Sequence, residues 1–218
     1  MPELDSESNP DRSAALEQYR RRAKYYDFEL ALFEHVRGLA IQHLHLTFGQ
    51  TVLDIGCGTG LSLHRLRTAV GAKGRVVGIE QSPHMIEQAR CRITQHGWQN
   101  VELICAPVAE AEIGVMGNAA LFHFTHDILR EKSSIANVVN HLKPGARVVA
   151  SGLKWASLWA LPLNLFVWPL ASELALHSVT TLEGMTEPWS KLEKFADGLR
   201  VETMHGGAIY VASGAVTE

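Results

Sequence analysis

Cysteine is scarce in this sequence of 218 residues. Cys57, Cys91 and Cys105 are the only three, and none of them belongs to a CxxC pair. An odd number of cysteines in this arrangement predicts neither a disulfide framework nor a cysteine zinc site. The first dozen residues are polar and acidic where a signal peptide carries its apolar core. We therefore expect a cytoplasmic protein.

The sequence also lacks an excess of charge of one sign. Its 20 basic and 23 acidic residues give a net charge of -3, whereas nucleic-acid-binding domains carry clustered basic residues. We expect no nucleic-acid partner. We also expect no metal, because His43 and His45, which are close in sequence, have no apparent third ligand.

No apolar run is long enough to cross a bilayer. The most apolar stretch, residues 155–170, is shorter than the about 20 residues of a spanning helix, and Pro162 and Pro169 interrupt it. We expect no transmembrane segment. A docking surface for lipid or for an apolar ligand stays open, so peripheral membrane contact remains an alternative.

The order of patterns along the chain indicates one α/β domain with an N-terminal extension. Residues 1–12 contain almost nothing apolar and predict a disordered tail. From residue 13 to about residue 46, apolar residues recur at steps of three and four, which predicts one or two helices. Short β-branched runs then alternate with helical patterns, as in a parallel sheet of βαβ units; these runs are residues 51–55, 75–80, 101–105, 119–124 and 146–151.

The C-terminal part continues this pattern after an apolar insertion. A turn at residues 143–145 leads into the fifth strand, and residues 188–196 have a helical pattern. Residues 199–204 and 208–213 are strand-like and are separated by His-Gly-Gly. We expect them to form a β-hairpin.

A glycine-rich turn follows the first predicted strand. The sequence VLDIGCGTG places Gly56, Gly58 and Gly60 at the carboxyl end of that strand, where doubly wound sheets bind their ligands. Glycine suits a tight turn that a ligand approaches closely. Glu80 ends the second strand, and a carboxylate there can accept hydrogen bonds from both ribose hydroxyls. These features indicate an adenosine-containing cofactor.

Two cofactor classes share this arrangement. A dinucleotide-binding fold has the spacing GxGxxG, but Leu61 occupies the position of its third glycine here. This disfavours a pyrophosphate ligand, although an NAD-dependent oxidoreductase stays an alternative that titration with a nicotinamide cofactor would test.

The sequence resembles the class I S-adenosylmethionine-dependent methyltransferases over about residues 50–214. The resemblance is carried by VLDIGCGTG, by the acidic end of the second strand followed by Ser-Pro-His-Met, and by LKPGARVV before the fifth strand. It implies a Rossmann-like, seven-stranded, mostly parallel sheet of order 3-2-1-4-5-7-6 with strand 7 antiparallel and helices on both faces. It also implies an N-terminal helical lid at residues 13–46 and a methyltransferase domain at residues 47–218, with the apolar insertion at about residues 154–185.

The resemblance further implies S-adenosylmethionine as cofactor, S-adenosylhomocysteine as product, and a set of binding residues. The glycines border the methionine and ribose parts, Asp54 orients the turn and the methionyl amino group, Glu80 binds the ribose, and Gln81 and Met85 pack on the adenine. The full set implied is Asp54, Gly56, Cys57, Gly58, Gly60, Glu80, Gln81, Met85, Ala106, Pro107, Val108 and Phe124.

One position departs from the family pattern. The family often carries an acidic residue after the third strand, which bonds the adenine amino group, but this chain reads Cys-Ala-Pro-Val at residues 105–108. Either backbone groups take over that contact, with Glu110 as a more distant candidate, or the affinity for the cofactor is reduced.

The carboxyl end of the fourth strand faces the methyl group in this family. His123 and His126 lie there and are candidates for a general base, because an imidazole titrates near neutral pH. Asp127 is a candidate for orienting one of them or for binding a substrate cation. The alternatives are structural: residues 126 and 127 cap the following helix, and His123 points into solvent or into the core.

Aromatic residues flank the expected reaction centre. Tyr25 and Tyr26 belong to the predicted lid, and Trp155 and Trp159 belong to the insertion, where related enzymes build their acceptor pocket. Tryptophans with few polar neighbours suit a small apolar or amphiphilic acceptor. In the alternative interpretation the tryptophans pack the insertion on the sheet or form a dimer interface.

The sequence is therefore compatible with three functions. The first is a methyltransferase for a small molecule, acting by in-line transfer on an oxygen, nitrogen or carbon atom, as a monomer or a homodimer. The second is the oxidoreductase. The third is a catalytically silent domain that binds the cofactor or a partner, which the altered adenine site keeps open and which turnover with an acceptor would eliminate.

Overall fold

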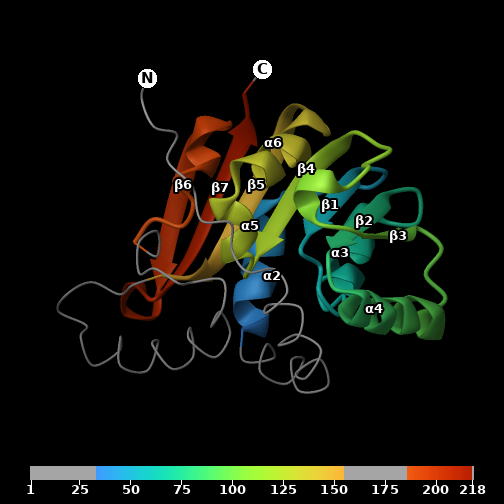
Figure 1. Cartoon of the computed structure of the whole chain (residues 1–218). Coiled ribbons are helices and arrows are strands. Elements are labelled where there is room, and N and C mark those ends of the chain that lie inside the picture. Colours follow the sequence, from blue (N-terminus) through green and yellow to red (C-terminus); the bar gives the residue numbers. More distant parts are fainter. Residues whose placement is uncertain (1–32, 155–185, 218) are drawn as a thin grey trace, which may run out of the picture.

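The computed structural model describes residues 33–154 and 186–217, which form a seven-stranded sheet of order β3-β2-β1-β4-β5-β7-β6 (Figure 1). β7 is antiparallel to its neighbours β5 and β6, and the other pairings are parallel. This confirms the predicted Rossmann-like sheet and its closing hairpin. The strands are β1 Thr51–Ile55, β2 Arg75–Glu80, β3 Val101–Cys105, β4 Gly117–His123, β5 Leu142–Leu153, β6 Ala196–Met204 and β7 Ile209–Val216.

Helices cover both faces of the sheet. Residues of α2, α3 and α4 pack on one face, and residues of α5, α6 and the 3-10 helices η1 and η3 pack on the other. Their bounds are α2 Glu34–His43, α3 Leu63–Val70, α4 Pro83–His96, η1 Val108–Glu110, α5 His126–Arg130, α6 Lys132–Asn140, η3 Leu192–Lys194 and η4 His205–Gly207.

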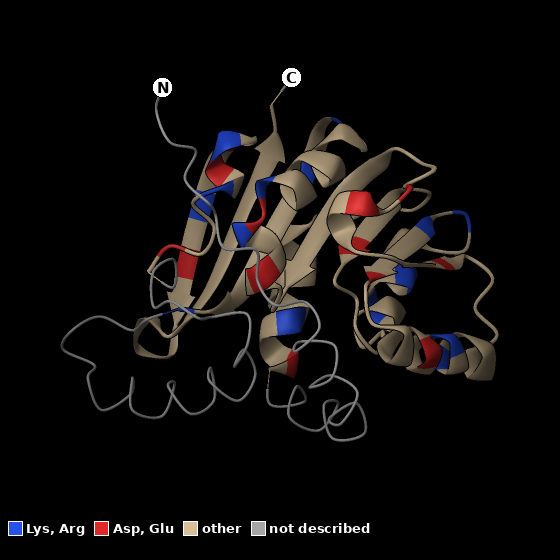
Figure 2. Ribbon diagram, viewed as in Figure 1, with Lys and Arg blue, Asp and Glu red and all other residues tan. Residues whose placement is uncertain are grey.

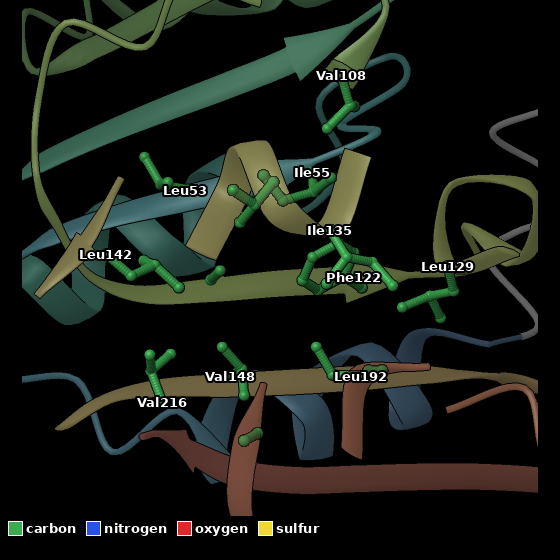
Figure 3. Packing of buried hydrophobic residues seen from close by; sticks show 14 of the residues in the cluster. Leu53, Ile55, Val108, Phe122, Leu129, Ile135, Leu142, Val148, Leu192 and Val216 are labelled. Atoms are coloured by element: carbon green, nitrogen blue, oxygen red, sulfur yellow. The ribbon is translucent and has the colours of Figure 1, made fainter. Parts of the chain in front are cut away.

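The central strands are buried on both faces, as their continuous apolar runs predict. Leu53 of β1 and Phe122 of β4 point to the face covered by Ile135 of α6 (Figure 3). Val52 and Leu121, which are their chain neighbours, point to the opposite face. Each fully buried side chain of this kind contributes about 1.5–3 kcal/mol to folding. The packing makes a rigid platform for the loops at the strand ends.

β1 lies at the switch point of the sheet. It pairs with β2 on one side and with β4 on the other, and all three strands are parallel. Their carboxyl ends therefore lie next to one another along one edge. The loops that leave these ends contain the glycine turn, Glu80 and the segment after His123.

The structure differs from the sequence prediction at several element boundaries. The helix expected over residues 188–196 is reduced to η3, because the chain from Ala196 onward pairs with β7 and this ladder overrides a weak helical pattern. β5 begins at Leu142, just before the expected turn at residues 143–145, since Leu142 pairs with Gly117. β4 ends at His123, one residue early, and α5 is an additional short helix.

Several predictions lie outside the described residues. These are the tail at residues 1–12, the first part (residues 13–32) of the lid predicted at residues 13–46, and all but the first residue of the insertion at about residues 154–185. The same holds for four proposed substrate residues, namely Tyr25, Tyr26, Trp155 and Trp159.

Charged residues of both signs are interspersed over the described helices and strands (Figure 2). None of the helices in the described part of the chain combines the length and the apolar character that crossing a membrane requires.

Candidate functional site

The turn after β1 adopts the backbone conformation for which glycine is suited. Gly56, Gly58 and Gly60 have φ angles of +65°, +55° and +83°, a region that side chains with a Cβ rarely adopt. The turn folds back on β2, where the Cys57 amide donates to the Ile79 carbonyl at 3.0 Å. The three glycines thus form the tight turn that was predicted after the first strand.

The glycine turn also packs against the loop that follows β4. A Cβ placed on Gly56 would lie 2.5 Å from Cγ2 of Thr125 and 2.9 Å from Cδ1 of Ile128. The two loops therefore meet at the switch point without a gap. Cys57 is buried within the turn, and burial raises the pKa of its thiol well above the usual value. Cys57 is thus not a reactive nucleophile in the described site.

Glu80 connects the glycine turn with the segment that follows β2. Its Oε2 accepts a hydrogen bond from the Gly58 amide at 3.2 Å, and its Oε1 accepts one from the Ser82 amide at 2.8 Å. The pKa of Glu80 is raised to about 7, mainly by burial and also by the nearby Asp127, against the lowering effect of the backbone amides. Each carboxylate oxygen keeps a second lone pair. Glu80 can therefore fix the turn and still accept from a ligand.

Asp54, at the end of β1, is buried, yet its Oδ2 has no hydrogen-bond partner. Burial raises the pKa of Asp54 to about 7; Arg37 opposes this increase and Glu80 adds to it. An unpartnered buried oxygen destabilises the ligand-free protein. Such an atom indicates a site built for a hydrogen-bond donor that the protein itself does not supply.

The carboxyl groups of the site act on one another. Asp127 raises the pKa of Glu80, and Glu80 raises the pKa of Asp54. The pKa of Asp127 is itself raised, mainly by desolvation. Three interacting carboxyl groups that are shielded from water favour binding of a positively charged ligand, because such a ligand would relieve their mutual repulsion.

The backbone turns sharply after β4. Phe124 has a φ of +59°, which is unusual for a residue other than glycine. Its amide donates to the Ser151 carbonyl at 2.8 Å, and its ring packs on Phe33, with 4.7 Å between the centroids. Strained residues of this kind cluster at functional sites. This contact ties the residue before α2 to the end of β4.

The two candidate histidines lie in different environments. Nδ1 of His123 is 2.8 Å from Oγ of Ser151, while its Nε2 is buried without a partner. Desolvation, with a smaller effect of Arg37, lowers the pKa of His123 to about 3. His123 therefore stays neutral at physiological pH, which favours a hydrogen-bonding role over that of a base.

His126 begins α5, and its Nε2 lies 2.6 Å from the carbonyl oxygen of Leu153. Desolvation lowers the pKa of His126, although Leu153 and Asp127 oppose the effect. A neutral ring donating from Nε2 keeps the lone pair on Nδ1. Of the two histidines, His126 is the better candidate for accepting a proton.

The remaining predicted residues surround these groups. Gln81 directly follows β2, and Met85 is buried on α4. The Ala106 amide donates to the Glu80 carbonyl at 3.1 Å, so the loop of Pro107 and Val108 starts beside β2. The structure thus gathers the predicted residues of the glycine turn, β2 and β4 at one edge of the sheet. The roles assigned to them individually stay predictions.

Sequence reasoning missed Arg37 and Thr125. Arg37 is buried on α2, and Nη2 of Arg37 and Oγ1 of Thr125 are buried without hydrogen-bond partners. A signal for Arg37 was present, because it occupies the apolar face of the helix together with Phe33, Val36 and Ala40. A lone charge on an apolar stripe is unusual unless it is paired.

Comparison with known proteins agrees with this geometry. Residues 46–162, more than half of the chain, match the family described as "Methyltransferase domain". The aklanonic acid methyltransferase DauC of Streptomyces sp. (strain C5) is 35% identical over 102 residues, 43% of this chain and 44% of that protein. The arsenite methyltransferase of Halobacterium salinarum is 31% identical over 108 residues, 47% of this chain and 27% of that protein. The chain thus spans less than half the length of these relatives.

A solved structure shares the fold. The N-methyltransferase NodS of Bradyrhizobium japonicum WM9, in complex with S-adenosylhomocysteine, superposes with a TM-score of 0.57 at 15% identity, covering 84% of this chain and 87% of NodS. The family match, the strand order and the glycine turn at the switch point lead to one conclusion. The chain belongs to the family of class I S-adenosylmethionine-dependent methyltransferase domains.

Proposed function

We propose that the protein transfers the methyl group of S-adenosylmethionine to a small apolar or amphiphilic molecule. The observation that carries this proposal is the unpartnered Oδ2 of Asp54, buried beside the three-glycine turn. A buried acceptor atom at this edge of the sheet needs a donor from a ligand. The α-ammonium group of the cofactor is such a donor.

The described residues fit this cofactor. Asp54, Glu80 and Asp127 form an acidic site, and S-adenosylmethionine carries a net positive charge through its sulfonium and ammonium groups. The positive φ angles of Gly56, Gly58 and Gly60 keep the turn tight, so its backbone can approach a ligand closely. Glu80 retains acceptor capacity for ribose hydroxyls while it holds the amides of Gly58 and Ser82.

Bound S-adenosylmethionine supplies an electrophilic methyl group on sulfur. The residues of this chain contribute position, charge and exclusion of water, which account for much of the rate in such transfers. The acidic side chains hold the positively charged ligand. Phe33 and Phe124 form an apolar wall beside the end of β4, which suits an acceptor with an apolar body.

We further propose that His126 is the general base where the acceptor must lose a proton. The Leu153 carbonyl fixes the ring so that Nδ1 is the accepting atom. Asp127, whose charge raises the pKa of His126, stabilises the protonated ring. An amine acceptor that arrives deprotonated does not need this step, whereas a hydroxyl or an acidic carbon does.

The name of one relative agrees with the proposed class of acceptor. DauC acts, by its name, on aklanonic acid, a small organic molecule. A small acceptor also agrees with the interspersed basic and acidic residues of the described helices and strands (Figure 2).

Calorimetric titration with S-adenosylmethionine and with S-adenosylhomocysteine tests the cofactor. We expect Glu80→Ala to weaken binding of both by about tenfold or more, because it removes charge-assisted hydrogen bonds. Glu112→Ala, at an exposed position outside the site, should bind as the wild type does. Absence of binding to folded wild-type protein would refute the proposal.

A screen of small apolar and amphiphilic acceptors, read out as S-adenosylhomocysteine formed, then tests catalysis. Turnover that depends on the acceptor supports the methyltransferase. Cofactor binding without turnover across acceptor classes would favour the catalytically silent domain instead.

A further inference from the structure

Tyr210 carries a buried hydroxyl group that has no hydrogen-bond partner among the described residues. The residue lies on β7, beyond residues 46–162, which match the methyltransferase family. Burial raises the pKa of the hydroxyl above its usual value, so the group stays protonated and keeps its hydrogen for donation. A buried donor without an acceptor destabilises the ligand-free protein. The hydroxyl therefore indicates a place for an oxygen atom of a ligand.

Tyr210 lies beside His126, the proposed general base. Tyr210 pairs with Gly152 on the neighbouring strand β5, and a Cβ on Gly152 would lie 2.6 Å from Cε1 of His126. The rings of Tyr210 and His126 stand nearly perpendicular, at 80°, with 6.2 Å between their centroids. The two side chains are therefore close enough for one small molecule to contact both.

The two side chains offer complementary polar groups to such a molecule. Nε2 of His126 lies against the Leu153 carbonyl, so Nδ1 is the atom that accepts a hydrogen. The hydroxyl of Tyr210 is a donor, and Trp189 packs on its ring with 4.9 Å between the centroids. An acceptor molecule that gives a hydroxyl proton to Nδ1 satisfies only the first group. A second oxygen atom, in an otherwise apolar molecule, satisfies the donor.

The strength of the base determines which oxygen group suits this pair. Desolvation lowers the pKa of His126, so the imidazole is a weaker base than usual, whereas a simple phenol such as the tyrosine side chain has a pKa of about 10. A carbonyl group conjugated with the reacting hydroxyl spreads the negative charge that forms and makes the proton more acidic. An ether or an isolated second hydroxyl lacks this effect.

We propose that the methyl acceptor is an apolar molecule whose reacting hydroxyl is conjugated with a carbonyl group, and that the hydroxyl of Tyr210 donates to that carbonyl oxygen. This inference rests on the proposed function and names the substrate class of the same site. Nδ1 of His126 takes the proton of the acceptor hydroxyl, and the acceptor oxygen forms a bond to the methyl carbon. The bond from the methyl carbon to sulfur breaks, its electron pair stays on sulfur, and His126 then returns the proton to solvent. Tyr210 stabilises the charge that moves to the carbonyl oxygen.

The test compares two probes that differ only in the carbonyl group. These are 4-hydroxyacetophenone and 4-ethylphenol, which has a methylene group in place of the carbonyl. Wild-type protein saturated with S-adenosylhomocysteine is titrated calorimetrically with each probe. We expect the ketone to bind about 3- to 10-fold more tightly, the range for one net hydrogen bond. Equal affinities, or no binding of either probe, would overturn the proposal, whereas the proposed function would stand on the binding of S-adenosylhomocysteine.

The variant Tyr210→Phe assigns this difference to the hydroxyl group. It should bind the ketone about 3- to 10-fold more weakly than the wild type does and bind 4-ethylphenol with unchanged affinity. Ile209→Val is the matched control, because Ile209 precedes Tyr210 on β7 but packs on the opposite face of the sheet; it should keep the preference for the ketone. A Tyr210→Phe variant that keeps this preference, or that loses affinity equally for both probes, would refute the role of the hydroxyl.

Urea unfolding separates ligand binding from a structural role of the hydroxyl. Ligand-free Tyr210→Phe should be at least as stable as the wild type, because the substitution removes a buried hydroxyl that has no partner among the described residues. A less stable variant would mean that the hydroxyl serves the folded protein itself, contrary to the proposal.

Turnover tests the acceptor class directly. With S-adenosylmethionine, the wild type should convert 4-hydroxyacetophenone to its methyl ether, detected by mass spectrometry. Binding of the ketone without methylation would refute the acceptor class. Failure of the folded wild type to bind S-adenosylhomocysteine would instead refute the proposed function itself.

Discussion

The imidazole of His126 is fixed by the backbone of β5, since its Nε2 lies 2.6 Å from the carbonyl oxygen of Leu153. A carbonyl oxygen only accepts hydrogen bonds, so Nε2 carries the hydrogen. The ring also lies edge-on to Tyr210, with 6.2 Å between the centroids. The Leu153 carbonyl of β5 therefore decides which nitrogen of His126 is free for chemistry, and Tyr210 of β7 packs beside the ring.

Gly152→Ala should disturb this arrangement. A Cβ on Gly152 would lie 2.6 Å from Cε1 of His126, which is too close for the ring to keep its place. We expect the spectrum of 15N-labelled histidine to show the Nε2-protonated tautomer in the wild type and a changed pattern in the variant. Gly114→Ala, which introduces a Cβ into open space, should leave the spectrum unchanged. A wild-type His126 protonated on Nδ1 would contradict the fixed tautomer, and an unaltered His126 signal in Gly152→Ala would contradict the close packing of the ring on Gly152.

Gly56→Ala should destabilise the protein and weaken cofactor binding. The position has a φ of +65°, and the new Cβ would lie 2.5 Å from Cγ2 of Thr125. We expect the free energy of unfolding to fall by about 1–3 kcal/mol, measured by urea unfolding. Gly38→Ala is the matched control: it lies within α2 with open space around its Cβ, so it should raise the stability by about 0.5–1 kcal/mol. Equal effects of the two substitutions would argue against strain at Gly56.

Local sequence patterns made the strands and the glycine turn of this site predictable. The runs at β1, β2 and β3 were predicted to the residue, since short β-branched runs bounded by turn residues are typical of strands. The glycine turn was predictable for the same reason, because its chemistry lies within nine consecutive residues.

Contacts between distant segments were not predictable in this way. The pairing of Nη1 of Arg37 with Glu34 is local, but the effect of Arg37 on Asp54 joins α2 to β1. The pKa of His123 likewise depends on burial and on Arg37, so the expectation of a base that titrates near neutral pH could not anticipate its value of about 3. Tertiary environment decides such properties, and periodicity carries no information about it.

Asp54→Asn should stabilise the ligand-free protein at alkaline pH while weakening cofactor binding. The pKa of Asp54 rises from 3.8 to about 7 on folding, so its ionisation opposes the folded state. The protonated carboxyl group therefore stabilises the folded wild type at low pH, and this stabilisation is lost as the pH rises through about 7. The neutral Asn side chain does not ionise and so avoids the loss. We expect the melting temperature of the variant to exceed that of the wild type by about 2–4 °C or more at pH 8, and by less at pH 5.

The exposed Asp197 provides the control for this effect. Asp197→Asn should leave the melting temperature within about 1 °C of the wild type at both pH values, as surface substitutions usually do. A lower melting temperature of Asp54→Asn at pH 8 would mean that the carboxylate stabilises the empty site, contrary to the direction of its pKa shift.

The affinity for S-adenosylmethionine should rise with pH through neutrality. Asp54 and Glu80 have pKa values of about 7 in the ligand-free protein, and a positively charged ligand binds the ionised acids. Binding below this pH must first remove a proton, so affinity falls as the acids become protonated. We expect Kd to decrease between pH 6 and pH 8 by about tenfold for each of the two acids that must ionise, because a group with a pKa of about 7 is mostly protonated at pH 6 and mostly ionised at pH 8. The Kd should level off above about pH 8. Calorimetry in buffers of different ionisation enthalpy should detect the released proton at pH 6.5, and less release in Asp54→Asn. A Kd that is constant from pH 6 to pH 8 would contradict the coupling of cofactor binding to these carboxylates.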